Sequence, residues 1–397
     1  MELYILDALF RRKILIEQFE SLLWTERFNE LGDFKAVLPA TNANRVLFKP
    51  GLYFGLNKSD RIMKLETVED TINDDGKESL TLTGRSLELI LTYRNAWYAN
   101  TALGDDPTWT VSGTPKEIID YIIKHQFIDG FAWYGYVIPN LSMSSLYPTD
   151  TILPPSESII VTTTKPMPVY DYIKDIAKKY SLGFRIYKGP QYDNNIYYNT
   201  YSGNDRSLGQ TELPPVLFSR DLENLNSLSS LKSVEKQFIG CYVFSKYGYD
   251  DVYVEDYVES ASGYTGLNRS IFSIVVTEPD ELTTESERQA YRQQKGREAL
   301  AEAQDIFIVD GEISERTTYI YGVDYFLGDL VDMRDDAGVI NRMRVVEQIF
   351  TEDAEGEKAY PTLASESLIA PGTWAALSGT LTWPNAVGEW NDQIGEI

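Results

Sequence analysis

The residue types that carry most nucleophilic, redox and metal chemistry are scarce in this sequence. It has one cysteine, Cys241, and one histidine, His125, among 397 residues. Zinc sites of cysteine and histidine, CxxC redox pairs and intrachain disulfides all require more of these residues. A nucleophilic triad with a histidine base would have to use His125, which follows a helix-like apolar run at 118–124 and is typical of a structural residue at a helix end. We therefore predict no catalytic residue, no metal and no cofactor.

Acidic residues are abundant, but their spacing matches no standard site. A calcium loop with Gly76 at its sixth position would have Thr71 and Leu82 at its first and twelfth positions, where carboxylates are needed. Two carboxylates at glycosidase separation can arise by chance among 60 Asp and Glu residues. Phosphate-binding loops and the nucleophile elbow are absent as well. A carboxylate-based glycosidase is therefore only the third of the functions that we consider.

The charge of the chain restricts its partners. With 36 Lys and Arg against 60 Asp and Glu, the formal net charge is −24. Sequence-specific DNA binding is not expected, because such binding depends on cations that displace counterions from phosphates. The N-terminus lacks the basic and apolar regions of a signal peptide, which predicts synthesis in the cytoplasm. Residues 131–149 are uncharged but too polar for a membrane helix, so no membrane segment is expected.

Tyrosine is the aromatic residue that stands out. The chain has 27 tyrosines against 16 phenylalanines, concentrated at 192–201 and 242–257. Because tyrosine combines a large contact area with a polar tip, it is common at protein interfaces. Tyr247 and Tyr249 are our candidate interface residues in the second of these segments. Ordinary strand faces and sugar-stacking platforms are the alternatives.

Three tryptophans are spaced along the C-terminal segment, which is rich in Ala, Gly, Pro and Ser. Trp374, Trp383 and Trp390 each carry a large apolar ring that needs cover. The segment could dock on a neighbouring subunit or fold back onto its own domain, and either arrangement would bury the three rings equally well. We therefore add these tryptophans to the possible interface residues.

Alternating apolar residues predict β-strands in the first hundred residues and again after about residue 214. A period of two places one side of a strand on a core, and the segments 73–76 and 335–338 are typical of hairpin turns. A short helix is expected at 84–91. The predicted strands are at 52–56, 80–82, 184–187, 196–201, 216–218, 238–244, 271–276, 331–334 and 342–349.

Two helices are predicted between the β regions. Thr114 and Glu117 form a capping box before the first, whose apolar face includes Tyr121. The second follows residue 168, and Gly183 lies just past its end, where a left-handed cap is favoured. The residues between them, 152–168, are predicted to be a loop.

A third, long helix is expected at about 284–303. Thr284 and Glu287 can cap it. Its apolar face, which includes Ala290, is thin, and Gly296 weakens it. Such a helix should lie half exposed.

These elements predict a mainly β protein with an α/β insertion, an α+β fold. The likeness of the two hairpin regions suggests two related β-barrel domains. The predicted domains are a first β-barrel at 1–95, the α/β insertion at 96–213, a second β-barrel with the long helix at 214–363, and a C-terminal extension at 364–397.

Several segments resemble the Gp37-like minor tail proteins of siphoviruses, in order across roughly residues 1–363. They are residues 24–39, the run 84–87 with Arg94, and residues 325–331. The family motif residues are Trp24, Gly32, Phe34, Gly84, Arg85, Tyr325, Leu327, Gly328 and Asp329.

The resemblance implies a tail-tip hub related to the gp27-type baseplate hub, in which three copies close into a ring below the tail tube. It implies two tube-type β-barrels in each subunit of a homotrimer. The partners would be the distal tail protein, the tape-measure protein and receptor-binding or central fibre proteins. The protein would lie at the tail tip of the virion after assembly in the host cytoplasm. Genomic DNA would pass through an acidic channel without specific binding, because like charges repel.

A second function remains in view. A carbohydrate-binding tail module could use the tyrosine-rich segments to hold host wall polysaccharide. A lytic domain is not expected, because only 34 residues follow Leu363, too few for a domain of its own.

Overall fold

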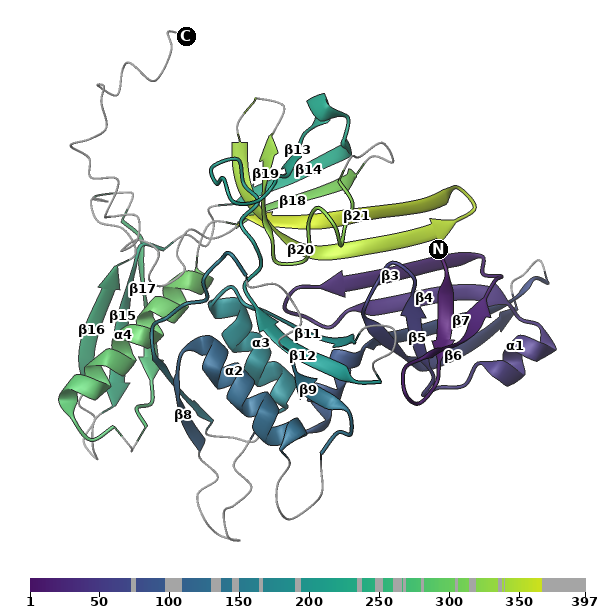
Figure 1. Cartoon of the computed structure of the whole chain (residues 1–397). Helices are drawn as coiled ribbons and strands as arrows, with labels where there is room; N and C mark the ends of the chain where they lie inside the picture. The colour runs from purple at the N-terminus through teal and green to yellow at the C-terminus, as the bar shows by residue number, and fades with distance from the viewer. Residues whose placement is uncertain are drawn as a thin grey trace. The chain divides into compact units, whose positions relative to one another are not determined.

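The computed structural model describes most of the chain and places its strands and helices (Figure 1). The described residues are 1–72, 76–96, 109–129, 137–144, 150–163, 167–189, 194–233, 238–246, 253–259, 266, 269–279, 282–303, 306–313, 319–334, 338 and 340–365. Contacts between them divide the chain into two units. The described residues of the first unit lie within 1–154, 159–236 and 305–366, and those of the second lie within 155–158 and 237–304. The predicted boundaries near 95, 213 and 363 stay a prediction.

A mixed sheet of 13 strands dominates the first unit and confirms the mainly β fold. Antiparallel pairs connect its main path from β14 to β2, and β19 pairs with both β20 and β13. In spatial order the strands are β14 (Leu225–Ser233), β18 (Ile306–Ile313), β21 (Gly356–Ser365), β20 (Ile340–Asp353), β3 (Ser21–Arg27), β4 (Asp33–Pro39), β7 (Glu78–Ser86), β6 (Ile62–Ile72), β5 (Tyr53–Leu56), β1 (Leu3–Leu6) and β2 (Arg12–Ile16), with β19 (Leu330–Arg334) and β13 (Leu217–Phe218) beside β20.

The pairing of β3 with β20 joins strands from the two ends of the chain (Figure 1). Trp24 lies opposite Phe350 in this pair, and Arg27 lies opposite Glu347. Among the described strands, β14 and β2 each pair on one side only, so the sheet does not close on itself there.

Two apolar clusters fill the core of this sheet. The first contains Trp24, Phe34, Phe54 and Leu82, and the last two of these lie in strands that the alternation predicts. The second gathers residues of β13, β19 and β20 and the segment before β19. The sequence predicts a short helix at 84–91, and this is wrong for its first three residues. β7 continues to Ser86, and a 3-10 helix, η1 (Leu87–Tyr93), follows it.

The described helix α1 (Asn42–Leu47) begins at Thr41, whose side chain accepts a hydrogen bond from the Asn44 amide at 3.1 Å. Ion pairs are part of its connection to the sheet. Arg45 pairs with Asp70 and with Glu78 on the neighbouring hairpin. The turn at 73–75 of that hairpin lies outside the described residues.

The α/β part of the first unit has its own core. Helices α2 (Pro115–Ile123) and α3 (Val169–Lys179) contribute to it beside the sheet of β11 (Gly183–Lys188), β12 (Ile196–Tyr201) and β9 (Leu141–Met143). The capping box of Thr114 and Glu117 is confirmed. Tyr121 was misplaced on the apolar face: its side chain is exposed, and Ile119 and Ile123 take the buried positions beside Ile118 and Ile122.

The end of α3 and the loop before it differ from the prediction. Ser181, with φ of 51°, holds the left-handed position, and Gly183 begins β11 instead. Gly183 is needed for another reason, because a Cβ there would collide with the ring of Phe28. The predicted loop at 152–168 contains the strand β10 (Ile159–Thr163), which pairs with β8 (Trp109–Gly113).

The second unit has a three-stranded sheet and one long helix. Strand β15 (Gly240–Lys246) pairs with β16 (Tyr253–Glu259) and β17 (Ile271–Val276), and α4 (Glu285–Glu302) packs against them (Figure 1). The capping box of Thr284 and Glu287 is confirmed. Ala290 is exposed, against the prediction. Gly296 lets the helix approach the sheet closely, since a Cβ there would lie 2.8 Å from side-chain atoms of Val243 and Val258.

Short helices complete the described elements. They are η2 (Lys124–Ile128), a π-helix that continues α2, and η3 (Arg220–Leu222), a 3-10 turn before β14. No described helix has the length and apolar character needed to cross a membrane.

Candidate functional site

The N-terminal motif residues meet where β3, β4 and β7 lie side by side. Phe34 on β4 lies opposite Gly84 on β7. A Cβ at Gly84 would lie 2.7 Å from Cε1 of Phe34 and would collide with the carbonyl of Lys64. Gly32 donates its amide to Ser86 Oγ at 2.9 Å, and a Cβ there would collide with the carbonyl of Thr25. Both glycines are therefore required by close approach of neighbouring strands.

Trp24 connects this core to a buried carboxylate. Its indole Nε1 donates to Glu26 Oε1 at 3.2 Å, the hydroxyl of Tyr321 donates to Glu26 Oε2 at 2.9 Å, and Ser59 also bonds Glu26. Burial raises the pKa of Glu26, while the charge of Arg61 opposes that rise. Glu26 thus ties β3 to the turn before β6 and to the segment before β19.

A buried ion pair lies next to this carboxylate. Arg61 pairs with Glu88, and both side chains are almost fully buried. Glu88 also accepts the backbone amide of Ile186 at 2.7 Å. Although burial alone would lower the pKa of Arg61, the charge of Glu88 raises it above its usual value. Arg61 directly precedes β6, Glu88 lies in η1, and Ile186 lies in β11. These interactions therefore connect the large sheet with η1 and β11.

The C-terminal motif surrounds a second buried carboxylate, Asp329. It accepts Arg206 Nε at 2.8 Å, the amide of Asn204 at 2.8 Å and the amide of Phe326 at 3.0 Å. Burial raises the pKa of Asp329, while these hydrogen bonds and the charge of Arg206 act in the opposite direction. Asp329 therefore fixes the turn before β19 to the segment after β12.

Gly328 and Phe28 bring the two motif regions into contact. Gly328 has φ of 89°, and a Cβ there would lie 2.5 Å from Cε2 of Phe28. Arg344 lies 5.3 Å from the centre of the Phe28 ring and donates to the carbonyls of Gly328 at 2.6 Å and Ser202 at 2.7 Å. Phe28 therefore packs among strands that are far apart in the sequence.

The remaining motif residues also have structural roles, in the core or in a surface ion pair. Tyr325 is buried and donates to Gln348 Oε1 at 3.0 Å, and burial raises its pKa. Leu327 lies in the same apolar cluster. Arg85 is different, because it lies at the surface and pairs with both oxygens of Glu66 at 2.7 and 2.8 Å. Arg94 stacks on the ring of Phe127.

The two residues that could have carried nucleophilic chemistry belong to different units. Cys241 is buried in β15, where burial raises the pKa of its thiol. His125 lies in η2 and stacks on Tyr121 at 5.6 Å between ring centres, and burial lowers its pKa. Among the described residues, no three His, Cys, Asp or Glu side chains are grouped to hold a metal ion.

The sequence reasoning missed several residues of these networks. Glu26, Arg61, Glu88, Arg206 and Arg344 are all buried, yet in the sequence they look like ordinary surface charges. Phe28 lies within a resembling segment, but nothing local marks it as a contact point. The predicted interface residues Tyr247, Tyr249, Trp374, Trp383 and Trp390 lie outside the described residues.

Solved structures share this fold over nearly the whole chain. A tail protein from Neisseria meningitidis MC58 matches with a TM-score of 0.56 and 12% identity, covering 93% of this chain and 98% of that one. The 43 kDa tail protein of prophage MuSo2 from Shewanella oneidensis matches with 0.54 and 14%, covering 91% and 98%. Prophage tail protein gp18 from Listeria monocytogenes EGD-e matches with 0.51 and 9%, covering 96% and 99%. At such identities the likeness shows a common fold.

A comparison with curated proteins finds no match. The family model for the Siphovirus ReqiPepy6 Gp37-like protein matches residues 2–363, which include every motif residue described above. Because this match spans nearly the whole chain, the chain belongs to the family of Siphovirus ReqiPepy6 Gp37-like proteins.

Proposed function

We propose that this protein is a non-enzymatic structural component of a phage tail. The observation that carries the proposal is the fold, which it shares along almost its full length with tail proteins of three bacterial sources. Membership of a siphovirus family supports the same role. The motif residues also fit a structural role, because most of them pack in the core or brace strands that are distant in the sequence.

Within the tail, we place the protein at the tip, as a trimeric hub of the gp27 type. Each subunit would supply two tube-type β-barrel domains to a ring. Free strand edges need cover, and among the described strands β2 and β14 each lack a partner on one side. Neighbouring subunits can provide that cover. The distal tail protein, the tape-measure protein and receptor-binding or fibre proteins would contact the ring.

The charge of the chain suits a DNA channel through such a ring. A net charge of −24 gives the subunit an acidic field that repels passing phosphates. DNA would then move through without specific binding.

Immunogold electron microscopy of virions tests the tail role. An antibody against this protein should label the tip of the tail. Virions that carry no label, although the protein is present in the lysate, would contradict a structural role.

Mass photometry and negative-stain microscopy test the hub separately. The purified chain, alone and mixed with the tail tube protein, should form threefold rings with an open channel. Monomers in both samples would refute the trimeric hub while leaving a tail role in place. Specific binding on a glycan array, lost when Tyr247 and Tyr249 are changed to Ala, would support the carbohydrate-binding module instead.

A further inference from the structure

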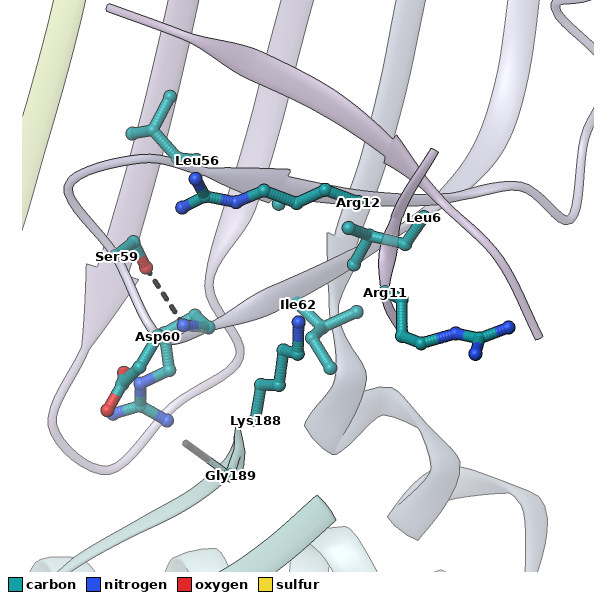
Figure 2. A pocket seen from close by; sticks show the side chains of 11 residues that line it. Leu6, Arg11, Arg12, Leu56, Ser59, Asp60, Ile62, Lys188 and Gly189 are labelled. Carbon is teal, nitrogen blue, oxygen red and sulfur yellow. Dashed lines mark hydrogen bonds between the residues drawn. The ribbon is translucent and has the colours of Figure 1, made fainter. Parts of the chain in front are cut away.

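A pocket of about 520 Å³ opens at the β1–β2 end of the large sheet (Figure 2). Its lining combines apolar side chains with a concentration of positive charge that is unusual in so acidic a chain. Strands β1, β2 and β5, the turn between β5 and β6, and the end of β11 all contribute. The lining residues are Leu6, Arg11, Arg12, Gly55, Leu56, Ser59, Asp60, Arg61, Ile62, Lys188 and Gly189.

Lys188 is held in this lining by its backbone. The amide of Lys188 donates to the carbonyl of Asp60 at 2.9 Å, next to a bridge between Arg61 and Tyr187. Its side chain extends from the end of β11 toward Ile62 in the view of Figure 2. Burial and the positive charge of Arg12 lower the pKa of Lys188, while Asp7 acts in the opposite direction.

Arg12 and Lys188 have no carboxylate in an ion pair among the described residues. The guanidinium of Arg12 lies 4.4 Å from the centre of the Tyr4 ring instead. The other cations of the lining are already compensated, because Arg11 pairs with Asp7 at 2.7 Å and Arg61 pairs with Glu88. The unmatched positive charge of the pocket therefore comes from Arg12 and Lys188, and Asp60 is the acidic residue of the lining.

The apolar character of the site continues beyond the pocket along β2. Strand pairing sets Leu6 opposite Arg12 and Tyr4 opposite Leu15, and the register shifts between these two pairs. Because of this shift, Arg12 and Leu15 lie on the same face of the hairpin as Leu6 and Tyr4, although they are three residues apart. The Leu15 side chain is 41% exposed on that face. A ligand that reaches from the pocket along β2 would therefore meet first a cation and then an exposed apolar side chain.

We propose that this pocket binds a segment of a partner protein in which a carboxylate side chain stands beside an apolar one. A guanidinium and an ammonium group favour an anion, and a guanidinium can hold a carboxylate through two hydrogen bonds. The aliphatic part of the lining and Leu15 favour a ligand with apolar groups. A simple phosphate polymer would leave those side chains uncovered. This inference does not depend on the position of the protein in the tail.

Isothermal titration calorimetry of the full chain with a blocked hexapeptide of alternating Glu and Leu tests the proposal. A peptide of alternating Gln and Leu is the matched ligand. We expect the Glu peptide to bind and its affinity to fall as salt is raised, and we expect the Gln peptide to bind at least about tenfold more weakly, as loss of a charged hydrogen bond implies. Equal affinity for the two peptides would overturn the proposal, and this comparison needs no variant.

Charge-reversal variants locate the site. Arg12→Glu and Lys188→Glu should each weaken binding of the Glu peptide by about tenfold or more. Lys35→Glu is the matched control, because it makes the same charge change at an exposed position of β4 away from the pocket. Its affinity should stay near that of the wild type. An equal loss in all three variants would show a general field effect and would overturn the site.

A third comparison separates the kinds of ligand. Leu15→Ala should weaken binding of the Glu peptide without destabilising the fold, since Leu15 is partly exposed. Inorganic polyphosphate is the competing probe. If polyphosphate binds with loss in Arg12→Glu while the Glu peptide does not bind, the pocket takes a polyanion and the protein-segment proposal is wrong.

Discussion

The ring of Phe28 lies directly against the backbone of Gly328, 300 positions later in the sequence. The amide of Phe28 donates to the carbonyl of Val346 at 2.9 Å, and the amide of Phe184 donates to the carbonyl of Phe28 at 3.1 Å. The end of β3, the start of β11 and β20 therefore meet at one aromatic side chain. The first prediction concerns this contact.

Gly328→Ala should lower the free energy of unfolding by about 2 to 4 kcal/mol, through overpacking against Phe28 and the cost of a positive φ. Gly322→Ala is the matched control. Gly322 has a similar φ of 85°, but a Cβ there would meet no atom within 4 Å. The Gly322→Ala variant should lower the free energy of unfolding by only about 1 kcal/mol, which is the cost of placing alanine at a positive φ. Urea denaturation of both variants measures the difference, and equal losses would show that Phe28 does not constrain Gly328.

Glu26→Gln should leave the protein within about 1 kcal/mol of the wild type at pH 7. Burial raises the pKa of Glu26 above its ordinary 4.5, so the protonated form stabilises the fold. That stability is fully present below about pH 4.5 and is lost as pH rises through the higher pKa of the folded protein. Glutamine stays neutral, and Arg61 keeps Glu88 as its partner.

The unfolding free energy of Glu26→Gln should therefore depend less on pH than that of the wild type above pH 4.5. Urea denaturation at a series of pH values measures this, with the exposed Glu69→Gln as control. A pH dependence unchanged by Glu26→Gln would contradict the raised pKa.

Asp329→Asn should behave in the opposite way and lower the free energy of unfolding by about 3 kcal/mol. Both oxygens of Asp329 accept hydrogen bonds, one from Asn204 and the other from Arg206 and Phe326. An amide NH2 group at either position would face a donor and leave a buried donor unsatisfied. Asp353→Asn, at an exposed turn, is the control and should have little effect. Thermal unfolding of the two variants compares them. A mild effect of Asp329→Asn would mean that Arg206 finds water or another acceptor.

Arg292→Met should destabilise the second unit by about 3 to 5 kcal/mol. The Arg292 side chain is 2% exposed and pairs with Asp256, with Glu278 at 2.5 Å and with Glu285 at 2.6 Å. Two of these carboxylates are almost fully buried and would lose their counter-charge. Hydrogen exchange of α4 amides measures the local effect.

The control for Arg292→Met is Arg269→Met. Arg269 is exposed and pairs with Glu259 at 3.8 Å, so its loss should cost about 1 kcal/mol or less. Similar exchange rates in both variants would show that the Arg292 cluster contributes little to the unit.

Features encoded over a few residues could be predicted from the sequence. The capping boxes at Thr114 and Thr284 each need only four residues, and both helices begin where predicted. The strands with strict alternation, such as those containing Leu82 and Met343, were also found. Gly84 misled the prediction, because its role depends on the carbonyl of Lys64 in a neighbouring strand.

The buried ionic networks could not be predicted, since their partners are far apart in the chain. Glu26 and Tyr321 are separated by 295 positions, and Arg206 and Asp329 by 123. A single sequence gives no signal for such pairs. The same holds for α4, whose buried side includes Arg292, Gln294 and Glu298 in addition to the apolar residues Tyr291 and Leu300 that helical spacing predicted.

The pairing of β3 with β20 has a consequence for synthesis. Arg27 and its partner Glu347 are 320 positions apart. At roughly 5 to 20 residues per second, β3 leaves the ribosome about 15 to 60 s before β20 exists. During that interval the edge of β3 that later receives β20 has no native neighbour. Nascent chains in crowded polysomes can therefore mispair there, and slower initiation or a bound chaperone should raise the yield of folded protein.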